Sequence, residues 1–230
     1  MSDTADQAES AHEVVSRVRA GETDFSGLEL EDASFSGARL RGVDFSSSSL
    51  PFADFEGANL SGARFDEADL VHASFRGARL DGASFKGASL PCVVLQGASL
   101  RGADLSDADI NDPDDSTTYY EAQDLDLREA CLSNAVLGGL TMDRSQFQKA
   151  DLHGARFVLV KLVGANLAGA DLSGVLLDGV DLSKADLRGA RLDGAQLRKV
   201  RLTGARLSRA QLASARSEDL DGEPAWEGAA

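Results

Sequence analysis

Large apolar residues recur at every fifth position along most of this chain. The segment FRGARLDGASFKGASL, residues 75–90, shows the pattern, with Phe or Leu at every fifth place and Ala two places before the last three of them. A period of five matches neither an α-helix, at about 3.6 residues per turn, nor a strand, at about 2. It matches a chain that turns a corner once in each pentad and points one large side chain inward between corners.

Two uninterrupted blocks carry this repeat. The first, residues 23–110, has 18 consecutive centres that are all Phe, Leu or Ile, and the second, residues 127–217, has 18 more that also include one Met. Gly often follows a centre by two places, where it suits a corner because it adopts positive φ at no steric cost. The pattern therefore predicts an all-β solenoid, in which the centre and the small residue before it are buried while the other three positions face water.

The order of Phe and Leu at the centres indicates how many pentads complete one turn of the solenoid. Phe and Leu alternate from Phe25 to Phe85. Three pentads per turn would stack Phe on Leu in every column, whereas four per turn stack Phe on Phe along two opposite sides and Leu on Leu along the other two. We therefore expect a four-sided coil of about 20 residues, repeated at the sheet spacing of about 4.8 Å.

A short helix is expected to cover the N-terminal end, where the first coil would otherwise expose its apolar interior. Ser10 and Glu13 have the spacing of a capping box, three valines follow on one helical face, and Gly21 can end the helix. We therefore assign residues 1–22 to an N-terminal tail and a capping helix over residues 11–20.

The C-terminal end is a second place where the interior needs a cover. Residues 218–230 form an acidic tail with five acids, together with Leu220 and Trp226. Two arrangements are open, because the tail can cover the last coil or the last coil can meet its copy in a second chain. Of these we expect the second, a homodimer through the C-terminal coils.

Charge is unevenly distributed over the four expected sides. The whole chain has a net charge of −15, which argues against a plain nucleic-acid-binding protein, since phosphate contacts need Lys and Arg. In the first block, the side built on Leu30 and every twentieth residue after it carries six acids and no cation. The adjacent side, built on Phe25, carries six acids and two cations, and the side opposite the first carries four Arg and one Asp. The acids of the two acidic sides are Asp24, Glu29, Glu31, Asp32, Asp44, Asp66, Glu67, Asp69, Asp104, Asp107, Asp109 and Asp112.

Such segregation suits a basic partner, and acids that merely solvate a rod are the alternative. The side built on Leu30 is also unusual at its corners, which contain Pro51–Phe52, Val71–His72 and Pro91–Cys92 where other sides tend to have Ser or Gly. An exposed strip that is both apolar and acidic suits a protein partner. The alternative is that these residues only mark a different corner geometry. His72 and Cys92 lack the further ligands of a metal site.

An interruption separates the two blocks. Residues 111–126, with the sequence NDPDDSTTYYEAQDLD, contain six acids, no cation and both tyrosines of the protein. The break in phase predicts a loop that leaves the acidic side in the middle of the rod. Its tyrosines and acids make it a candidate contact element, and a solvated loop without a partner is the alternative.

The second block is basic, with 14 cations and 8 acids in residues 127–217. Its arginines can bind the acidic tail or a partner. We do not expect direct DNA binding, because no aromatic residues are interleaved with the arginines as in a platform for single strands.

The pentads follow the motif [A/S/V]-[D/N/R/S]-[L/F]-x-G, as in A-D-L-S-G and A-R-L-D-G, and over residues 23–217 the chain resembles the pentapeptide-repeat proteins. This resemblance implies a right-handed quadrilateral β-helix. The length, the N-terminal cap and the single mid-rod loop further resemble the branch that protects topoisomerases, which includes quinolone-resistance, mycobacterial gyrase-binding and self-immunity proteins. By resemblance, a rod that mimics DNA would engage DNA gyrase or topoisomerase IV and release a poison. The loop contact would then fall on Asn111, Asp112, Asp114, Asp115, Tyr119, Tyr120 and Glu121.

Other functional classes find little support in the sequence. A regular convex rod offers no concave pocket with converging catalytic groups, so we expect no enzyme, cofactor, metal or small-molecule substrate. Two cysteines and the lack of a long apolar run predict a soluble, cytoplasmic protein that does not enter a membrane. The competing class is a structural or regulatory scaffold for protein–protein interaction with no topoisomerase target.

Overall fold

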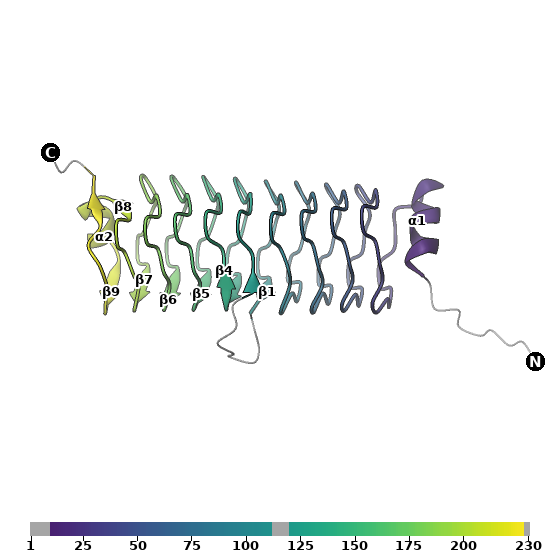
Figure 1. Cartoon of the computed structure of the whole chain (residues 1–230), viewed down its shortest axis with the longest axis horizontal. Helices are drawn as coiled ribbons and strands as arrows, with labels where there is room; N and C mark the ends of the chain where they lie inside the picture. The colour runs from purple at the N-terminus through teal and green to yellow at the C-terminus, as the bar shows by residue number, and fades with distance from the viewer. Residues whose placement is uncertain (1–9, 112–119, 228–230) are drawn as a thin grey trace, which may run out of the picture.

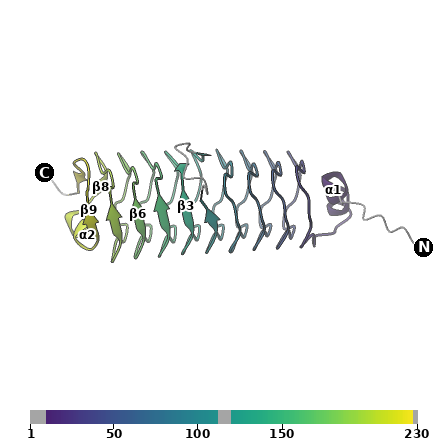
Figure 2. The same cartoon turned by 90° about the horizontal axis from the view of Figure 1, so that it is seen from below.

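The computed structural model describes residues 10–111 and 120–227. These residues form an elongated rod of stacked coils, with the N-terminal helix at one end and the C-terminal residues at the other (Figure 1). The coils keep a similar outline along the rod when it is seen from below (Figure 2). Every surface of the described residues is therefore a side, a corner or an end of one solenoid (Figure 1).

Regular secondary structure is brief, because each side of a coil contributes only one to three residues to a ladder. Most ladder positions are single bridges, such as that between Asp24 and Asp44. The helices and strands of the described residues are α1 (Ala11–Arg19), β1 (Asp109–Ile110), β2 (Tyr120–Glu121), β3 (Val136–Gly138), β4 (Leu140–Thr141), β5 (Arg156–Val158), β6 (Leu176–Asp178), β7 (Gln196–Arg198), β8 (Arg206–Leu207), α2 (Arg209–Ala213), β9 (Arg216–Glu218) and β10 (Ala225–Trp226).

A regular coil has four sides and 20 residues, as the alternation of Phe and Leu predicted. Parallel partners lie 20 residues apart, so that Glu29 pairs with Ser49, Ser49 with Asp69, and Asp69 with Ser89. Strands β5, β6 and β7 keep the same spacing in the second block. The predicted quadrilateral β-helix is thus confirmed.

Stacked side chains fill the inside of the coil. The Phe centres form two columns, in which the rings of Phe55 and Phe75 lie 4.9 Å apart and those of Phe65 and Phe85 lie 5.0 Å apart. The two columns meet edge to face, as between Phe75 and Phe85, whose ring planes are 89° apart. Offset stacks and edge-to-face contacts are the favoured arrangements of aromatic pairs, so the like-on-like order read from the sequence also satisfies the rings' electrostatics.

The corners place their second residue in the left-handed region of the backbone. The φ angle is 63° at Gly57, 58° at Phe52 and 57° at His72. Gly is favoured there because a Cβ atom crowds the following carbonyl oxygen in this conformation. Phe52 and His72 therefore share their φ with the glycine corners, so this torsion does not set their corner apart.

Two buried serines adapt the coil where Leu replaces the usual Ala. Leu125 occupies such a position, and its N–H donates to Ser145 Oγ in the next coil at 3.1 Å, while the same hydroxyl donates to the carbonyl of Ala122 at 3.4 Å. Ser48 makes the same two bonds beneath Leu28. The hydroxyl therefore replaces the direct backbone bond that closes most other corners.

Helix α1 covers the N-terminal coil as predicted. Ser10 Oγ accepts the N–H of Glu13 at 3.3 Å, Val14 is buried against the core, and Gly21 follows the helix with a φ of 99°. Arg17 extends over the Phe25 ring, at 4.9 Å from its centroid. The helix thus supplies both an apolar and a cationic contact to the open end.

The insertion in the middle of the rod is shorter than predicted. Ladder partners that cross it lie 27 residues apart, as for Asp109 and Val136, so this coil has seven more residues than a regular one. Tyr120–Glu121 forms β2 beside β4, and Ala122 is fully buried at a centre. The predicted loop boundary at residue 126 is therefore wrong. Ala122 occupies the position of a large central residue, and Leu125 occupies the position of a small one, so the pentad around Ala122 does not show the repeat pattern in the sequence.

The C-terminal residues form a further coil instead of a free tail. Strands β9 and β10 pair with β7 and β8, and Ser208 caps α2 through a capping box with Gln211. Leu212, predicted as the last centre, lies in α2 and is only partly buried. Trp226, like Leu212, packs against the hydrophobic core, and the guanidinium of Arg209 lies 5.4 Å from the centroid of its ring.

Candidate interaction surface

One side of the first block carries acids in register along the rod. We call it the acidic side and define it by the ladder that joins Glu29, Ser49, Asp69, Ser89 and Asp109, together with the corner that follows each of them. Acids eighty residues apart in the sequence thus lie on one flank, as predicted. Strands β3, β5, β6, β7 and β9 continue this flank through the second block.

The aspartates of this side also close corners. Asp69 Oδ1 accepts the N–H of Val71, and Asp109 Oδ1 accepts the N–H of Asn111, both at 3.1 Å. Each is an Asx turn that stabilises the backbone locally. Sequence reasoning missed this second role, although the Asp one place before a centre was the available signal.

The acids of the acidic side have no ion-pair partner among the described residues. The salt bridges of the first block involve other sides of the rod, and Glu29, Glu31, Asp32, Asp69 and Asp109 take part in none of them. Asp112, which belongs to this set by sequence, lies outside the described residues. The negative charge of this side is therefore left uncompensated by ion pairs within residues 10–111 and 120–227.

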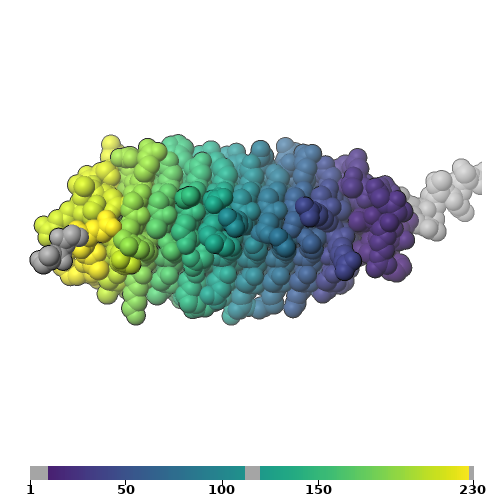
Figure 3. Space-filling view, turned by 90° about the horizontal axis from the view of Figure 1, so that it is seen from above, coloured from purple at the N-terminus to yellow at the C-terminus, as the bar shows by residue number. Residues whose placement is uncertain are grey.

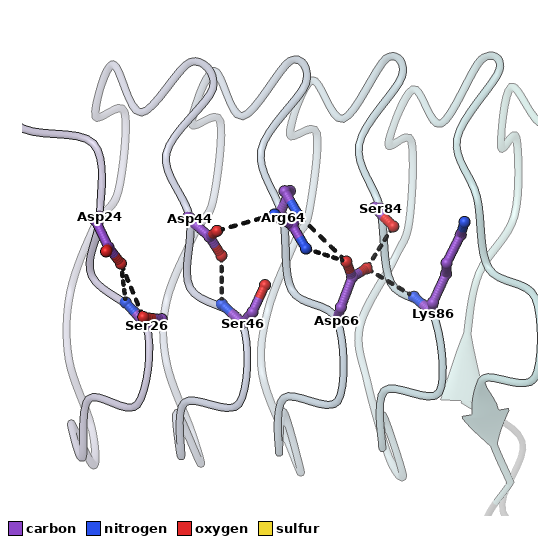
Figure 4. Close-up of polar contacts among 8 residues, drawn as sticks. All are labelled: Asp24, Ser26, Asp44, Ser46, Arg64, Asp66, Ser84 and Lys86. Atoms are coloured by element: carbon purple, nitrogen blue, oxygen red, sulfur yellow. Dashed lines mark hydrogen bonds and ion pairs between the residues drawn. The ribbon is translucent and has the colours of Figure 1, made fainter.

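The neighbouring side is partly neutralised, which the sequence count alone did not show (Figure 4). Arg64 lies between two carboxylates, with 3.2 Å to Asp44 and 3.0 Å to Asp66. Lys86 contacts Asp104 at 3.0 Å. The predicted contact residues Asp24, Glu67 and Asp107 form no ion pair in the described part of this side.

Hydrogen bonds and ion pairs also set the protonation of this neighbouring side. Burial raises the pKa of Asp66, but bonds from Ser84 and Arg64 outweigh that effect and leave the pKa below its usual value. The pKa of Arg64 is raised by its hydrogen bond to Asp66 and by the charge of Asp44. The carboxylate of Asp66 is thus held ionised by intramolecular contacts.

The corner after the acidic side presents a row of apolar and aromatic groups. We call Pro51, Phe52, Val71, His72, Pro91 and Cys92 the corner ridge. The rings of Phe52 and His72 stack at 4.9 Å with an interplanar angle of 11°. Phe52 is 47% exposed, the largest exposure of any large apolar side chain that the structure describes.

The two ends of the insertion are seated on a pair of glycines. A Cβ atom at Gly138 would lie 1.8 Å from Asn111 Oδ1, so only Gly leaves room for the Asn111 side chain. On the other end, the N–H of Tyr120 donates to the carbonyl of Gly139 at 2.8 Å. The chain therefore leaves and re-enters the rod at one fixed place on the corner after the acidic side.

The predicted loop residues divide into two groups. Asn111, Tyr120 and Glu121 are described, and Glu121 lies 3.9 Å from Arg76, while Asp112, Asp114, Asp115 and Tyr119 lie outside the described residues. Two further acids of the predicted loop, Asp124 and Asp126, belong to the coil and form ion pairs. Their partners are Arg144, at 2.7 Å from Asp124, and Arg128.

The basic second block is partly paired internally, through Arg128, Arg144, Arg188, Arg191, Arg201 and Arg206. Arg201 lies between Asp181 and Asp221, at 3.2 and 2.9 Å. Arg191 contacts Asp171 at 2.9 Å. One acid of the predicted C-terminal tail, Asp221, thus neutralises a basic residue of the preceding coil, which is one of the two roles that the sequence left open for these arginines.

Clusters that could hold a metal ion are lacking in residues 10–111 and 120–227. Potential metal ligands do not gather there in groups of three or more. His153, Ser173 and Asp171 do not have the arrangement of a catalytic triad. His153 Nδ1 lies 3.0 Å from Ser173 Oγ, but this hydroxyl donates its proton to Asp171 and not to the histidine.

The face turned to the viewer in Figure 3 is a closed convex surface without a deep hollow. Neither helix of the described residues is long and apolar enough to cross a bilayer.

Comparison with known families agrees with this geometry. A family model for pentapeptide repeats matches the chain in eight copies, over residues 16–46, 48–87, 78–112, 123–157, 155–194 and 190–216. The chain is a pentapeptide-repeat protein. Members of this family are in general binding or scaffold proteins and not enzymes. No curated protein sequence matched the chain.

Solved structures of other pentapeptide-repeat proteins are similar to this one. HetL of the cyanobacterium Nostoc, involved in heterocyst differentiation regulation, is 28% identical over 96% of this chain and 99% of HetL, with a TM-score of 0.34. Full-length QnrB1, a plasmid-mediated fluoroquinolone resistance protein, is 18% identical over 87% of this chain and 89% of its own, with a TM-score of 0.38. A protein of the Arabidopsis thaliana thylakoid lumen is 31% identical over 66% and 70%, with a TM-score of 0.20. HetL is involved in differentiation regulation and QnrB1 in drug resistance, so these likenesses assign no role to this chain.

Proposed function

We propose that this pentapeptide-repeat protein binds the DNA-binding region of a type II topoisomerase, DNA gyrase or topoisomerase IV, and protects it from a poison. The observation that carries the proposal is the line of acids without ion-pair partners on one flank of a rigid rod. Such a rod presents charge to a groove that normally holds DNA. Its fixed backbone loses little conformational entropy on binding.

The charge density supports this idea in magnitude. Eight described acids without an ion pair, on the acidic side and its neighbour, extend over five coils, which is on the order of 20 Å. Duplex DNA carries one charge per about 1.7 Å of axis. The charge density of these acids and that of DNA are therefore of the same order. The opposite side of the rod has no such row of acids in the first block, and its Arg79 and Arg101 are paired to acids. The acids are Asp24, Glu29, Glu31, Asp32, Glu67, Asp69, Asp107 and Asp109.

The insertion is the second contact element in this proposal. It starts at Asn111, next to the last acid of the ladder, Asp109, and ends at Tyr120. In the topoisomerase-protecting branch that the chain resembles, a loop in the middle of the rod contacts gyrase. We assign the same role here to residues 111–121, including Asp112, Asp114, Asp115 and Tyr119.

A homodimer through the C-terminal coils belongs to the same proposal. Leu220 is 36% exposed, and Leu212, Ala215 and Trp226 are only partly buried at that end of the rod. A second copy would cover these apolar groups and double the length of the acidic surface. Sedimentation equilibrium at micromolar concentration distinguishes the dimer from a monomer capped by its own last coil.

The test is gyrase supercoiling in the presence of a quinolone, with and without this protein. The variant to compare replaces residues 112–119 by a single Gly, which removes the seven extra residues and restores a regular 20-residue coil with Gly at the left-handed corner. We expect the wild type to restore supercoiling and this variant to lose protection while keeping its melting temperature. A wild type without effect at micromolar concentration would overturn the proposal and leave the scaffold function.

A further inference from the structure

The corner ridge is the feature of the acidic side that charge mimicry does not explain. DNA phosphates are mimicked by carboxylates, and an aromatic stack adds nothing to such a field. Yet Phe52 and His72 hold their rings together on the outside of the rod, 4.9 Å apart, with Phe52 47% exposed. This ridge therefore needs a reason of its own.

The backbone makes the ridge costly to keep. Phe52, His72 and Cys92 have φ angles of 58°, 57° and 59°, where a residue with a Cβ atom is strained. At the two corners that follow in each of these coils the equivalent residue is Gly, for example Gly57 and Gly62. Phe52 and His72 pack on each other outside the coil, and none of the three side chains belongs to the buried core.

The charges beside the ridge indicate the chemistry of what covers it. Glu31, Asp32, Asp69 and Asp109 border the ridge and form no ion pair in the described part of the protein. An apolar row edged by uncompensated carboxylates complements an apolar row edged by Lys or Arg. It repels nucleic acid and anionic lipid headgroups.

We propose that the corner ridge is the docking site for an amphipathic helix of a partner protein, with an apolar stripe bordered by Lys and Arg. The Phe52–His72 stack is the anchor of this contact. The row advances by one coil, about 4.8 Å, while a helix advances by about 5.4 Å per turn, so successive helical turns meet successive coils. From Phe52 to Cys92 the ridge spans about two turns of such a helix.

The inference extends the proposed function and rests on it in one respect, because gyrase is the protein probe. The helix would belong to the topoisomerase, and the ridge would distinguish that enzyme from other proteins with a basic DNA-binding groove. Carboxylates would supply a salt-sensitive part of the affinity, and the ridge a part that survives high salt.

The decisive variant is Phe52→Gly, which removes the anchor and relieves the strained backbone. We expect it to keep or raise the melting temperature, so that lost binding is not a folding defect. Leu159→Gly is the matched control, since Leu159 has a φ of 54°, is 42% exposed and occupies the same corner column after the insertion, beside Arg156. We expect this control to bind like the wild type.

Two probes keep the outcomes distinguishable. The first probe is purified gyrase at about 0.5 M salt, where the Debye length is only a few Å. Under this condition Phe52→Gly should bind gyrase about tenfold more weakly than the wild type, and Leu159→Gly should bind it as tightly as the wild type. With synthetic helical peptides, the wild type should prefer a Leu/Lys peptide about tenfold over a Ser/Lys peptide of equal charge, and Phe52→Gly should lose this preference.

The two probes separate the two proposals. If gyrase does not bind the wild type, the topoisomerase proposal fails and the peptide pair alone decides the ridge. If Phe52→Gly keeps wild-type binding to gyrase and keeps the same ratio between the peptides, the ridge is no docking site. Equal loss in Leu159→Gly would also overturn the proposal, because the effect would then not depend on the acidic side.

Discussion

The hydroxyl of Ser145 sits between two coils and accepts the backbone N–H of Leu125 at 3.1 Å. Ser145 is fully buried, and its own proton goes to the carbonyl of Ala122. This pair shows how the coil absorbs a Leu where the repeat wants an Ala. It also explains why the insertion looks longer in the sequence than it is in the structure.

Ser145→Ala should lower the free energy of unfolding by about 1–3 kcal/mol, because it leaves the N–H of Leu125 and the carbonyl of Ala122 buried without partners. Urea unfolding measures the change. Ser89→Ala, at an exposed ladder position, is the control and should be neutral. Equal stability of the two variants would contradict the role given to the hydroxyl.

Gly138→Ala should displace the insertion without disturbing the coil. The new Cβ would meet Asn111 Oδ1 at 1.8 Å, while the backbone at Gly138 is extended and accepts any residue. We expect weaker quinolone protection with a small change in melting temperature. The double variant Asn111→Ala with Gly138→Ala removes the clash and should recover part of the protection; a single variant that protects fully would show that the seat of Asn111 does not matter.

Phe55→Ala should be strongly destabilising, by about 3–5 kcal/mol, since it opens a cavity between two stacked rings in the middle of a column. The neighbouring rings lie at 5.0 Å for Phe35 and 4.9 Å for Phe75. Phe52, three residues earlier and outside the coil, provides the contrast, and its replacement by Gly should not destabilise. Thermal melts of both variants check the inside-outside assignment, which would be wrong if the order were reversed.

Acid should weaken the rod through its paired carboxylates. The pKa of Asp186 is lowered by its hydrogen bond from Arg188, so its contribution to stability is complete above the unfolded value, about 3.9, and disappears as pH falls through the folded value. Stability of the wild type should therefore fall below about pH 4. Asp186→Asn keeps the bond to the Arg188 N–H and loses the charge, so its unfolding free energy should change less between pH 6 and pH 3 than that of Asp54→Asn. An unchanged pH dependence in Asp186→Asn would contradict this account.

The regular part of the fold could be predicted from the sequence because each coil repeats one simple rule. A Phe or Leu every fifth residue, with Phe on Phe at a distance of 20, is enough to place Glu29, Asp69 and Asp109 on one flank. The rule fails where packing overrides it. Ala122 does not look like a centre, and Leu125 is buried at a small-residue position because Ser145 makes room for it.

The charge pattern was only half predictable for a similar reason. Register follows from counting, but ion pairs depend on where long side chains reach. Arg64 neutralises Asp44 and Asp66 on the neighbouring side, whereas no cation reaches Asp69 among the described residues. The C-terminal coil was missed because its centres are Ser217, Gly222 and Trp226, which do not follow the repeat.

The central claim is that the unpaired carboxylates of the acidic side bind the partner. Its most direct test is the affinity for purified gyrase of a triple variant, Glu29→Gln, Asp69→Asn and Asp109→Asn, in which both Asn residues keep the Asx turns. Asp54→Asn is the matched control, because Asp54 lies on another side of the rod and closes its corner in the same way, by accepting the N–H of Glu56. We predict that the triple variant binds at least about tenfold more weakly at low salt, with a shallower salt dependence, while the control binds like the wild type. Equal affinity and an equal salt dependence of the triple variant and the wild type would contradict the account.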